Sequence, residues 1–184
     1  MLSPHPDATL PIGLIVSDQR TVEFMTQAVR KRHFGVIDED QKRTMSGLEF
    51  VQGLVDGTLP LNPMAETLGY DIIDVSRGRV IVAAEPHGKH GNPFGTVHGG
   101  LAATLLDTCM GLAVLSMLDK GFGQTTLEFK ILLVRPITPH MGLVKAQGTV
   151  ISCGRHVGTA EGSLTDKDGR TLAHGTTTCL IFEH

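Results

Sequence analysis

The stretch NPFGTVHGGLAATLLDTCMGLAVLSML, Asn92 to Leu118, decides how the rest of the chain is interpreted. After a glycine-bearing loop come His98-Gly99-Gly100 and then about 18 residues with no proline and almost no charge. Leucines and threonines recur there at helical spacing, while alanine, glycine and methionine occupy the other faces. This pattern predicts a helix that is buried on most sides. The residues at helical spacing are Leu101, Thr104, Leu105, Thr108, Leu112 and Leu115.

Two groups in this stretch could carry chemistry. Asp107 lies in the middle of the predicted helix, where an ionised carboxylate is costly to bury unless something uses or satisfies it. At the helix start, Gly99 and Gly100 leave the first-turn amides open to close approach. With the helix dipole, these amides suit a developing negative charge, such as the oxyanion of a thioester or ester. The structural alternatives are a tight glycine turn and an ordinary hydrogen-bonded carboxylate.

The spacing of the two groups makes them more informative as a pair. Gly99 and Asp107 are eight positions apart, which is about 12 Å along a helix that rises about 1.5 Å per residue. One helix cannot easily present its first amide and this carboxylate to the same carbonyl carbon. If both act on one bond, they come from two copies of the chain with antiparallel helices at a shared interface. The spacing therefore predicts a composite site and a homodimer.

The segment from Asn92 to Gly100, followed by Leu106-Asp107, resembles the hotdog-fold acyl-CoA thioesterases of the PaaI type. That family has the motif N-x-x-G-x-x-H-G-G and then a helix with an acidic residue eight positions after the first glycine of the pair. The resemblance covers roughly residues 62–183, and its motif is fairly specific for the family but weak for the substrate. It implies thioester hydrolysis with Asp107 as general base or nucleophile and the Gly99 and Gly100 amides polarising the carbonyl.

Four further residues are candidates for the site. The Asn92 amide suits holding a water or the thioester oxygen, or it forms an Asx turn ahead of Pro93. His98 fixes the loop or polarises a carbonyl, or it only hydrogen-bonds the turn. The resemblance places Thr126 at the Ser/Thr position associated with the catalytic carboxylate. It also implies that Arg135 faces a coenzyme A phosphate at the sheet edge, where a solvated strand end is the alternative.

Composition excludes several classes of protein. The 184 residues are 41% hydrophobic and 19% charged, which fits one soluble domain with an extension. A net charge of −3 and 4% aromatic residues disfavour nucleic acid as a partner. The three cysteines show no zinc or redox spacing, and His87, His90 and His98 match no standard zinc pattern. We therefore expect no metal, no cofactor and a cytoplasmic protein with reduced thiols.

The pattern of elements predicts an α+β protein, and its layout agrees with the hotdog fold that the resemblance implies. Residues 1–45 are predicted to be an N-terminal extension with an amphipathic helix at Thr21–Phe34 and a linker at Val36–Met45, and residues 46–184 the hotdog domain. A helix at Ser46–Asp56, opened by an S-x-x-E capping box, and a helical turn after Asn62 precede the first strand. The strands are expected at residues 71–76, 79–84, 124–134, 142–152, 156–165 and 170–182. Two strands, a long helix and four strands suit an antiparallel sheet wrapped around that helix.

The leading functional hypothesis is hydrolysis of an aromatic or medium-chain acyl-CoA to the free acid and CoA. No G-x-S-x-G nucleophile elbow is present, which disfavours a serine hydrolase of the α/β class. The alternatives are a non-catalytic acyl-CoA binding or sensing module and a hotdog hydratase or dehydratase. The expected partners are acyl-CoA and further copies of the chain, in a dimer or a tetramer. The apolar run Leu10–Val16 is too short to span a bilayer and lacks the flanks of a signal peptide, so no membrane partner is expected.

Overall fold

A computed structural model describes residues 32–184. The helix predicted at Thr21–Phe34 lies outside the described residues except for its last three positions. The described chain begins with three short helices, α2 (Glu39–Thr44), α3 (Gly47–Asp56) and α4 (Pro63–Leu68), which precede the sheet. The strands are β1 (Tyr70–Ser76), β2 (Arg79–Ala84), β3 (Phe122–Leu133), β4 (Val144–Cys153), β5 (Val157–Thr165) and β6 (Thr171–Glu183). Between β2 and β3 lie the 3₁₀ turn η1 (Gly88–His90) and the long helix α5 (Gly99–Leu115).

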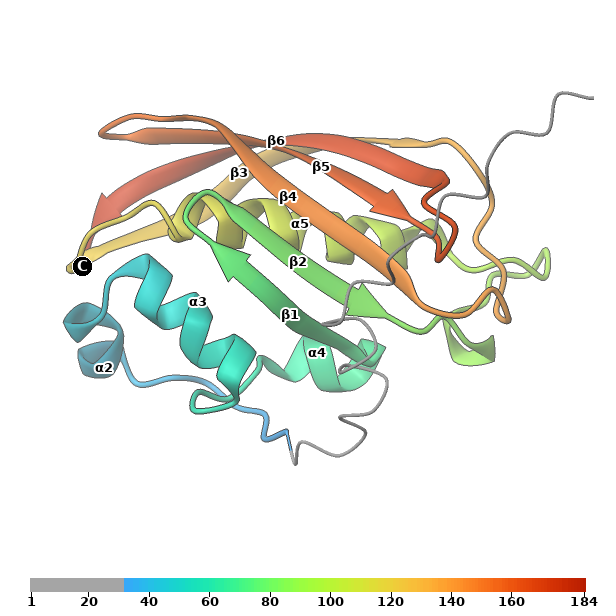
Figure 1. The fold of residues 1–184 in the computed structure, drawn as a ribbon, viewed down its shortest axis with the longest axis horizontal. Helices are drawn as coiled ribbons and strands as arrows, with labels where there is room; N and C mark the ends of the chain where they lie inside the picture. Colours follow the sequence, from blue (N-terminus) through green and yellow to red (C-terminus); the bar gives the residue numbers. More distant parts are fainter. Residues whose placement is uncertain (1–31) are drawn as a thin grey trace, which may run out of the picture. The chain divides into compact units, whose positions relative to one another are not determined.

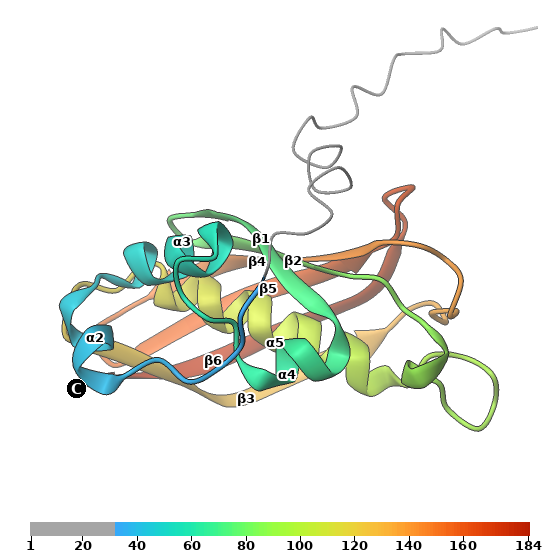
Figure 2. The same ribbon diagram turned by 90° about the horizontal axis from the view of Figure 1, so that it is seen from below.

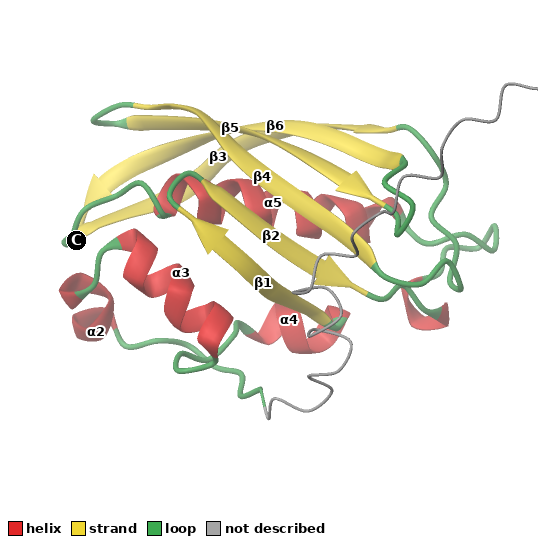
Figure 3. Cartoon of the chain, in the orientation of Figure 1, coloured by secondary structure: helices red, strands yellow, loops and turns green. Residues whose placement is uncertain are grey.

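The six strands form one antiparallel sheet that curves around α5 (Figures 1 and 3). Its order is β1-β2-β4-β5-β6-β3, so β1 and β3 are the edge strands. Each predicted strand is present, with ends within two residues of those expected from turn signals and alternation. The hotdog arrangement predicted from the order of elements is thus confirmed.

Helix α5 packs directly against the concave face of the sheet. Glycines on the strands permit this approach, because a Cβ on Gly148 would stand 2.3 Å from the carbonyl oxygen of Cys109. A Cβ on Gly162 would stand 2.8 Å from Cγ of Met110. The fully buried side of α5 combines leucines, among them Leu101 and Leu105 of the predicted stripe, with smaller or more flexible residues such as Cys109 and Met110. Thr104, Thr108, Leu112 and Leu115 of that stripe are only partly buried.

Helix α3 lies beside β1 and α5 (Figure 2). Its predicted capping box is present: Ser46 Oγ accepts from the N–H of Glu49, and the Glu49 carboxylate accepts from the N–H of Ser46 at 2.7 Å. Gly57 ends the helix in the left-handed region with φ 75°, a conformation that glycine adopts without strain.

The predicted linker Val36–Met45 contains helix α2, which corrects the sequence interpretation. Asp38 caps the helix by accepting from the N–H of Asp40, at 2.9 Å. Acidic residues in its first turn and basic residues in its last turn complement the helix dipole. The polar composition that suggested a linker is the charge pattern of a short surface helix. The boundary predicted between residues 45 and 46 stays a prediction.

Within residues 32–184, no helix combines the length and the apolar character needed to cross a membrane. The thiols of Cys109, Cys153 and Cys179 are all free, and Cys109 and Cys179 are buried. Burial raises the pKa of the Cys109 thiol, so this side chain contributes to packing against the sheet rather than to nucleophilic chemistry.

Candidate functional site

Asp107 and Thr126 meet where α5 crosses β3. The Thr126 hydroxyl donates a 2.9 Å hydrogen bond to Oδ1 of Asp107. Both side chains are half-buried, so the carboxylate remains accessible from one side. The structure thus brings together two of the residues that the sequence singled out, although they are 19 positions apart.

These two side chains border a cavity of about 330 Å³. Its walls come from α5 and β3 on one side and from the segment between Gly35 and Pro63 on the other. The apolar part includes Phe50, Leu54 and Ile72. A carboxylate beside an apolar chamber of this size can act on a group whose tail enters the chamber.

Two helical turns before Asp107, α5 begins with His98 as N-cap. Nδ1 of His98 accepts the Gly100 N–H at 2.9 Å, so that amide is already engaged. The structure places no acceptor among residues 32–184 on the Gly99 N–H. Gly99 rather than Gly100 therefore offers the open first-turn amide. A Cβ on Gly99 would stand 2.9 Å from Cδ1 of Leu133, which shows how closely β3 passes this amide.

Asn92 organises the loop that leads into α5. Its Oδ1 accepts from the backbone N–H of Phe94 at 2.9 Å and of Thr96 at 3.3 Å. Its Nδ2 donates to the Thr96 hydroxyl at 2.8 Å. These contacts are those of the Asx turn considered from the sequence, and one amide hydrogen stays free of them.

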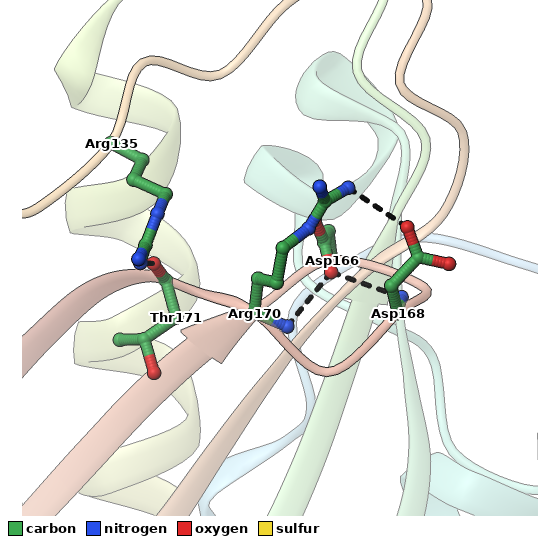
Figure 4. Close-up of polar contacts among 5 residues, drawn as sticks. All are labelled: Arg135, Asp166, Asp168, Arg170 and Thr171. Atoms are coloured by element: carbon green, nitrogen blue, oxygen red, sulfur yellow. Dashed lines mark hydrogen bonds and ion pairs between the residues drawn. The ribbon is translucent and has the colours of Figure 1, made fainter. Parts of the chain in front are cut away.

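Arg135 follows β3 and lies beside the turn between β5 and β6 (Figure 4). Its Nη1 donates to the carbonyl oxygen of Thr171. In the same turn, Arg170 pairs with Asp166 and Asp168, both at 2.8 Å, whereas Arg135 has no carboxylate partner within residues 32–184. Its exposed positive charge is therefore available to an anion.

Gly99, Asn92 and Arg135 line one cavity, of about 260 Å³. It shares no lining residue with the cavity at Asp107. The strand β3 connects the two regions, because Thr126 lies beside Asp107 and Leu133 lies beside Gly99. A single copy of the chain therefore holds the predicted site residues as two separate groups.

The three histidines noted in the sequence all lie at or before the start of α5. His87 and His90 stack with ring centroids 3.8 Å apart, whereas His98 caps α5. Among the described residues, no three His, Cys, Asp or Glu side chains gather in an arrangement that would hold a metal ion.

The sequence analysis did not predict two features of the Asp107 cavity. Residues 35–37 and Lys42, within the predicted extension, form part of its wall. Gln124 of β3 also lines it, and its Oε1 is buried without a hydrogen-bond partner among residues 32–184. A signal for Gln124 was available: it lies two positions before Thr126, on the same face of a strand.

Comparison with known proteins identifies the family. The thioesterase superfamily matches residues 94–173. A Halobacterium salinarum protein provisionally named an esterase is 38% identical over 99 residues, which are 51% of this chain and 64% of that relative. The chain thus spans less than two thirds of that relative's length. Human acyl-coenzyme A thioesterase 13 is 28% identical over 105 residues, which are 56% of this chain and 74% of that protein.

The solved structure of the Escherichia coli PaaI protein, from the phenylacetic acid degradation operon, has the same fold. It superposes with a TM-score of 0.60 at 23% identity and covers 65% of this chain and 83% of that chain. The predicted family and fold are confirmed by these comparisons. The chain therefore contains a thioesterase-superfamily domain with the hotdog fold found in PaaI.

Proposed function

We propose that the chain hydrolyses aromatic or medium-chain acyl-CoA thioesters to the free acid and CoA. Membership of the thioesterase superfamily supports thioester hydrolysis, and the name of the human relative supports CoA as the thiol. The observation that carries the proposal is the Asp107 carboxylate, held by Thr126 at 2.9 Å on the wall of an apolar cavity.

In the proposed reaction, Asp107 takes a proton from a water whose oxygen attacks the thioester carbonyl carbon. The carbonyl oxygen becomes an oxyanion, which the Gly99 N–H and the positive end of the α5 dipole stabilise. When the C–S bond breaks, the thiolate leaves with the bonding electrons and takes up the proton. In the alternative route, Asp107 attacks the carbonyl carbon itself, and water then hydrolyses the resulting anhydride.

The amide and the carboxylate belong to different cavities of one chain, so we propose that two copies complete each site. The edge strand β3 is the surface that best suits this pairing, because its outer edge pairs with no other strand of residues 32–184 and so offers free backbone groups. Leu127 and Leu132 on β3 are 58% and 65% exposed, and Phe94 in the loop before α5 is 91% exposed. A second copy paired along β3 would cover this apolar surface.

In this assembly the cavity that contains Gly99 and Arg135 receives the CoA part of the substrate. Arg135 is the candidate for a phosphate, because guanidinium groups bind phosphate well and this one has no carboxylate partner within residues 32–184. The acyl group then extends from the carbonyl carbon into the cavity beside Asp107.

A thiol-release screen with phenylacetyl-, benzoyl- and straight-chain acyl-CoA tests the proposal, with sedimentation of the same preparation to determine its assembly. We expect CoA release from a dimer or larger oligomer. Tight acyl-CoA binding without release of thiol would contradict hydrolysis and favour a binding module. Full activity in a monomer at the assay concentration would overturn the composite site but not the reaction.

A further inference from the structure

The short helix α2 contributes to the outer wall of the cavity at Asp107, through Lys42. Judged against residues 32–184, none of the six residues of α2 is buried, whereas α3 directly after it buries Val51 and Leu54. A helix of this length is too short to be stable by itself in water. The position of α2 therefore depends on its contacts with the rest of the chain.

The chain is anchored on both sides of α2. Before it, Ile37 is 8% exposed and belongs to the hydrophobic core. After it, Ser46 forms the capping box that begins α3. The residues that flank α2 directly, Asp38 and Met45, have extended backbones with ψ of 143° and 145°. Residues at the ends of an element can absorb the change in backbone angles when that element moves, so α2 can leave the surface while its neighbours stay in place.

One side chain of α2 reaches the end of the sheet, beside the last residue of the chain (Figures 1 and 2). Glu39 Oε1 lies 2.6 Å from Nδ1 of His184, which directly follows β6. The imidazole of His184 lies over Gly123, where a Cβ would stand 2.6 Å from Nε2. Its backbone N–H donates to the carbonyl oxygen of Gly121 at 2.9 Å. The sheet therefore holds His184 in place, and Glu39 is the half of the contact that moves with α2.

Two cavities adjoin at α2. The cavity of about 330 Å³ that contains the catalytic candidate carboxylate shares Lys42, Phe50 and Gln124 with a second cavity, of about 280 Å³. Glu39 and His184 both line the second cavity, so their contact closes part of its wall. If this contact breaks and α2 moves off the sheet, Lys42 leaves the walls of both cavities. Both then open to water on the side that α2 covers.

We propose that α2 is a lid over the acyl cavity and that the contact between Glu39 and His184 is the latch that holds it closed. This inference rests on the proposed thioesterase function, which places the acyl group in the cavity beside Asp107. With the lid closed, α2 shields the acyl group from water and slows its departure. With the lid open, the acyl group has a route to water that does not pass the CoA part of the substrate.

Hydrogen exchange in the ligand-free full chain tests the latch independently of the reaction. The N–H of Lys42 donates to the carbonyl oxygen of Asp38 at 3.1 Å, so its exchange, followed by NMR, reports unwinding of α2. Glu39→Ala should speed this exchange about 2- to 5-fold, the scale of an exposed ion pair. Asp40→Ala removes a carboxylate from the same turn of α2 and is the matched control, which should keep the wild-type rate. Equal exchange in wild type and Glu39→Ala would overturn the latch.

A second variant separates the latch from the effect of Glu39 on its own helix. Glu39 also pairs with Lys42, at 3.1 Å, and His184→Ala keeps that pair while removing the latch. His184→Ala should therefore speed the exchange of the Lys42 N–H as well. When it is combined with Glu39→Ala, the exchange should become no faster than in Glu39→Ala alone, because both changes remove one contact. Effects that multiply in the double variant would show that the two residues act independently and would overturn the latch.

Ligands test whether the lid covers the acyl group. In S-hexyl-CoA and S-phenethyl-CoA a methylene replaces the thioester carbonyl, so these thioethers bind without being hydrolysed. Both should slow the exchange of the α2 amides in wild type, and free CoA should not. Stopped-flow measurements should show both thioethers leaving Glu39→Ala about 2- to 5-fold faster than wild type, with free CoA unchanged.

The outcomes for the lid and for the reaction are distinct. Exchange of α2 that responds to neither thioether would overturn the lid, and thiol release from acyl-CoA by the same preparation would leave the proposed hydrolysis in place. Equal dissociation of the thioethers from wild type and Glu39→Ala would also overturn the lid. If α2 responds to the thioethers but no thioester is hydrolysed, the proposed reaction fails and the lid stands.

Discussion

The N-terminus of α5, at Gly99, and the middle of the helix, at Asp107, hold different functional groups. Around Asp107 the functional groups are side chains that border a chamber with apolar walls. Around Gly99 they are a backbone amide, a loop amide and an arginine that line a separate cavity. The first region offers a carboxylate base, and the second offers a backbone donor and a cation with no carboxylate among its lining residues.

In the proposed composite site, one sequence motif supplies two groups that a single copy keeps in separate cavities. Gly99 and Asp107 belong to one short motif, but about two helical turns separate them along α5. Antiparallel pairing of two copies would bring Gly99 of one α5 towards Asp107 of the other. Each variant below alters either the Asp107 region or the Gly99 region, and the variants are ordered from the largest expected effect to the smallest.

The largest effect is expected at Asp107. Asp107→Asn keeps the volume and an oxygen that accepts from Thr126, but removes the basic carboxylate. We expect kcat to fall by about 10²- to 10⁴-fold, with KM and melting temperature changing little. Asp119→Asn, an exposed carboxylate between α5 and β3, is the matched control. Normal turnover by Asp107→Asn on the best substrate would contradict a catalytic role for Asp107.

At the opposite end, Gly99→Pro removes the open amide while keeping the helix start. Proline suits the first helical position, and His98 before it has φ −62° and ψ 137°, which a following proline tolerates. We expect kcat to fall by about 10²- to 10³-fold. Gly99→Ala adds a Cβ beside Leu133 but retains the N–H, so it should lose less activity. Equal losses in the two variants would mean that crowding, not the amide, is responsible.

Mixing the Asp107→Asn and Gly99→Pro variants tests whether the two residues act in one site. If each site combines Gly99 from one copy with Asp107 from the other, a mixed dimer of the two variants holds one intact site. Random pairing of Asp107→Asn with Gly99→Pro should then restore about a quarter of wild-type activity. Lack of any recovery in a mixture shown to contain mixed dimers would mean that both residues act within one copy.

The sequence predicted the elements better than the cavity walls. Alternation and turn residues defined the strands to within two residues, because these are local signals. The Asp107–Thr126 contact was indicated only through the family resemblance, since it joins residues 19 positions apart. Helix α2 was missed because its charged residues also suit a linker.

Three features of the site depend on tertiary structure and could not be predicted from local patterns. The wall at residues 35–37 arises where the chain pairs with Leu61 through a bridge at Phe34. The engagement of the Gly100 N–H depends on the rotamer of His98. The position of the Gln124 amide depends on the space above Gly111, more than ten residues away in the chain.

A smaller loss is expected when the partner of Asp107 is removed. Thr126→Val keeps the shape but not the hydroxyl, so the carboxylate loses one hydrogen bond and its orientation. We expect kcat to fall by about 10-fold, the scale of one hydrogen bond to a charged group, and Thr126→Ser to recover most of it. Thr125→Val, on the exposed face of the same strand, is the control. A change confined to melting temperature would assign Thr126 a structural role alone.

At the Gly99 end, Arg135→Gln should raise KM for acyl-CoA by about 5-fold and leave kcat nearly unchanged, the scale of an exposed ion pair. The effect should weaken as salt is added. It should vanish with a pantetheine thioester, which lacks the nucleotide phosphates of CoA. Arg155→Gln, on the turn between β4 and β5, is the control. An equal rise in KM for both thiols would place the contribution of Arg135 elsewhere than on these phosphates.

The smallest effect concerns the loop that holds Gly99 and should appear only in acid. His90 is 7% exposed, and its burial and then the nearby His87 lower its pKa below the usual value. The pKa of a histidine in an unfolded chain is about 6.5. Below about that pH the unfolded chain binds the proton more readily, so stability falls as pH decreases. The His90 carbonyl oxygen accepts from the N–H of His98 at 2.8 Å, so loosening this turn would disturb the N-terminus of α5 before it reaches Asp107.

His90→Asn, which cannot take up this proton, should therefore flatten the fall in melting temperature between about pH 7 and pH 5, and His156→Asn, an exposed control, should not. Hydrogen exchange locates the effect, because amides of the loop before α5 should lose protection in acid before those around Asp107 do. A steep acid dependence that persists in His90→Asn would assign it to other groups. Earlier loss of protection around Asp107 would mean that the middle of α5 opens in acid before its N-terminus does.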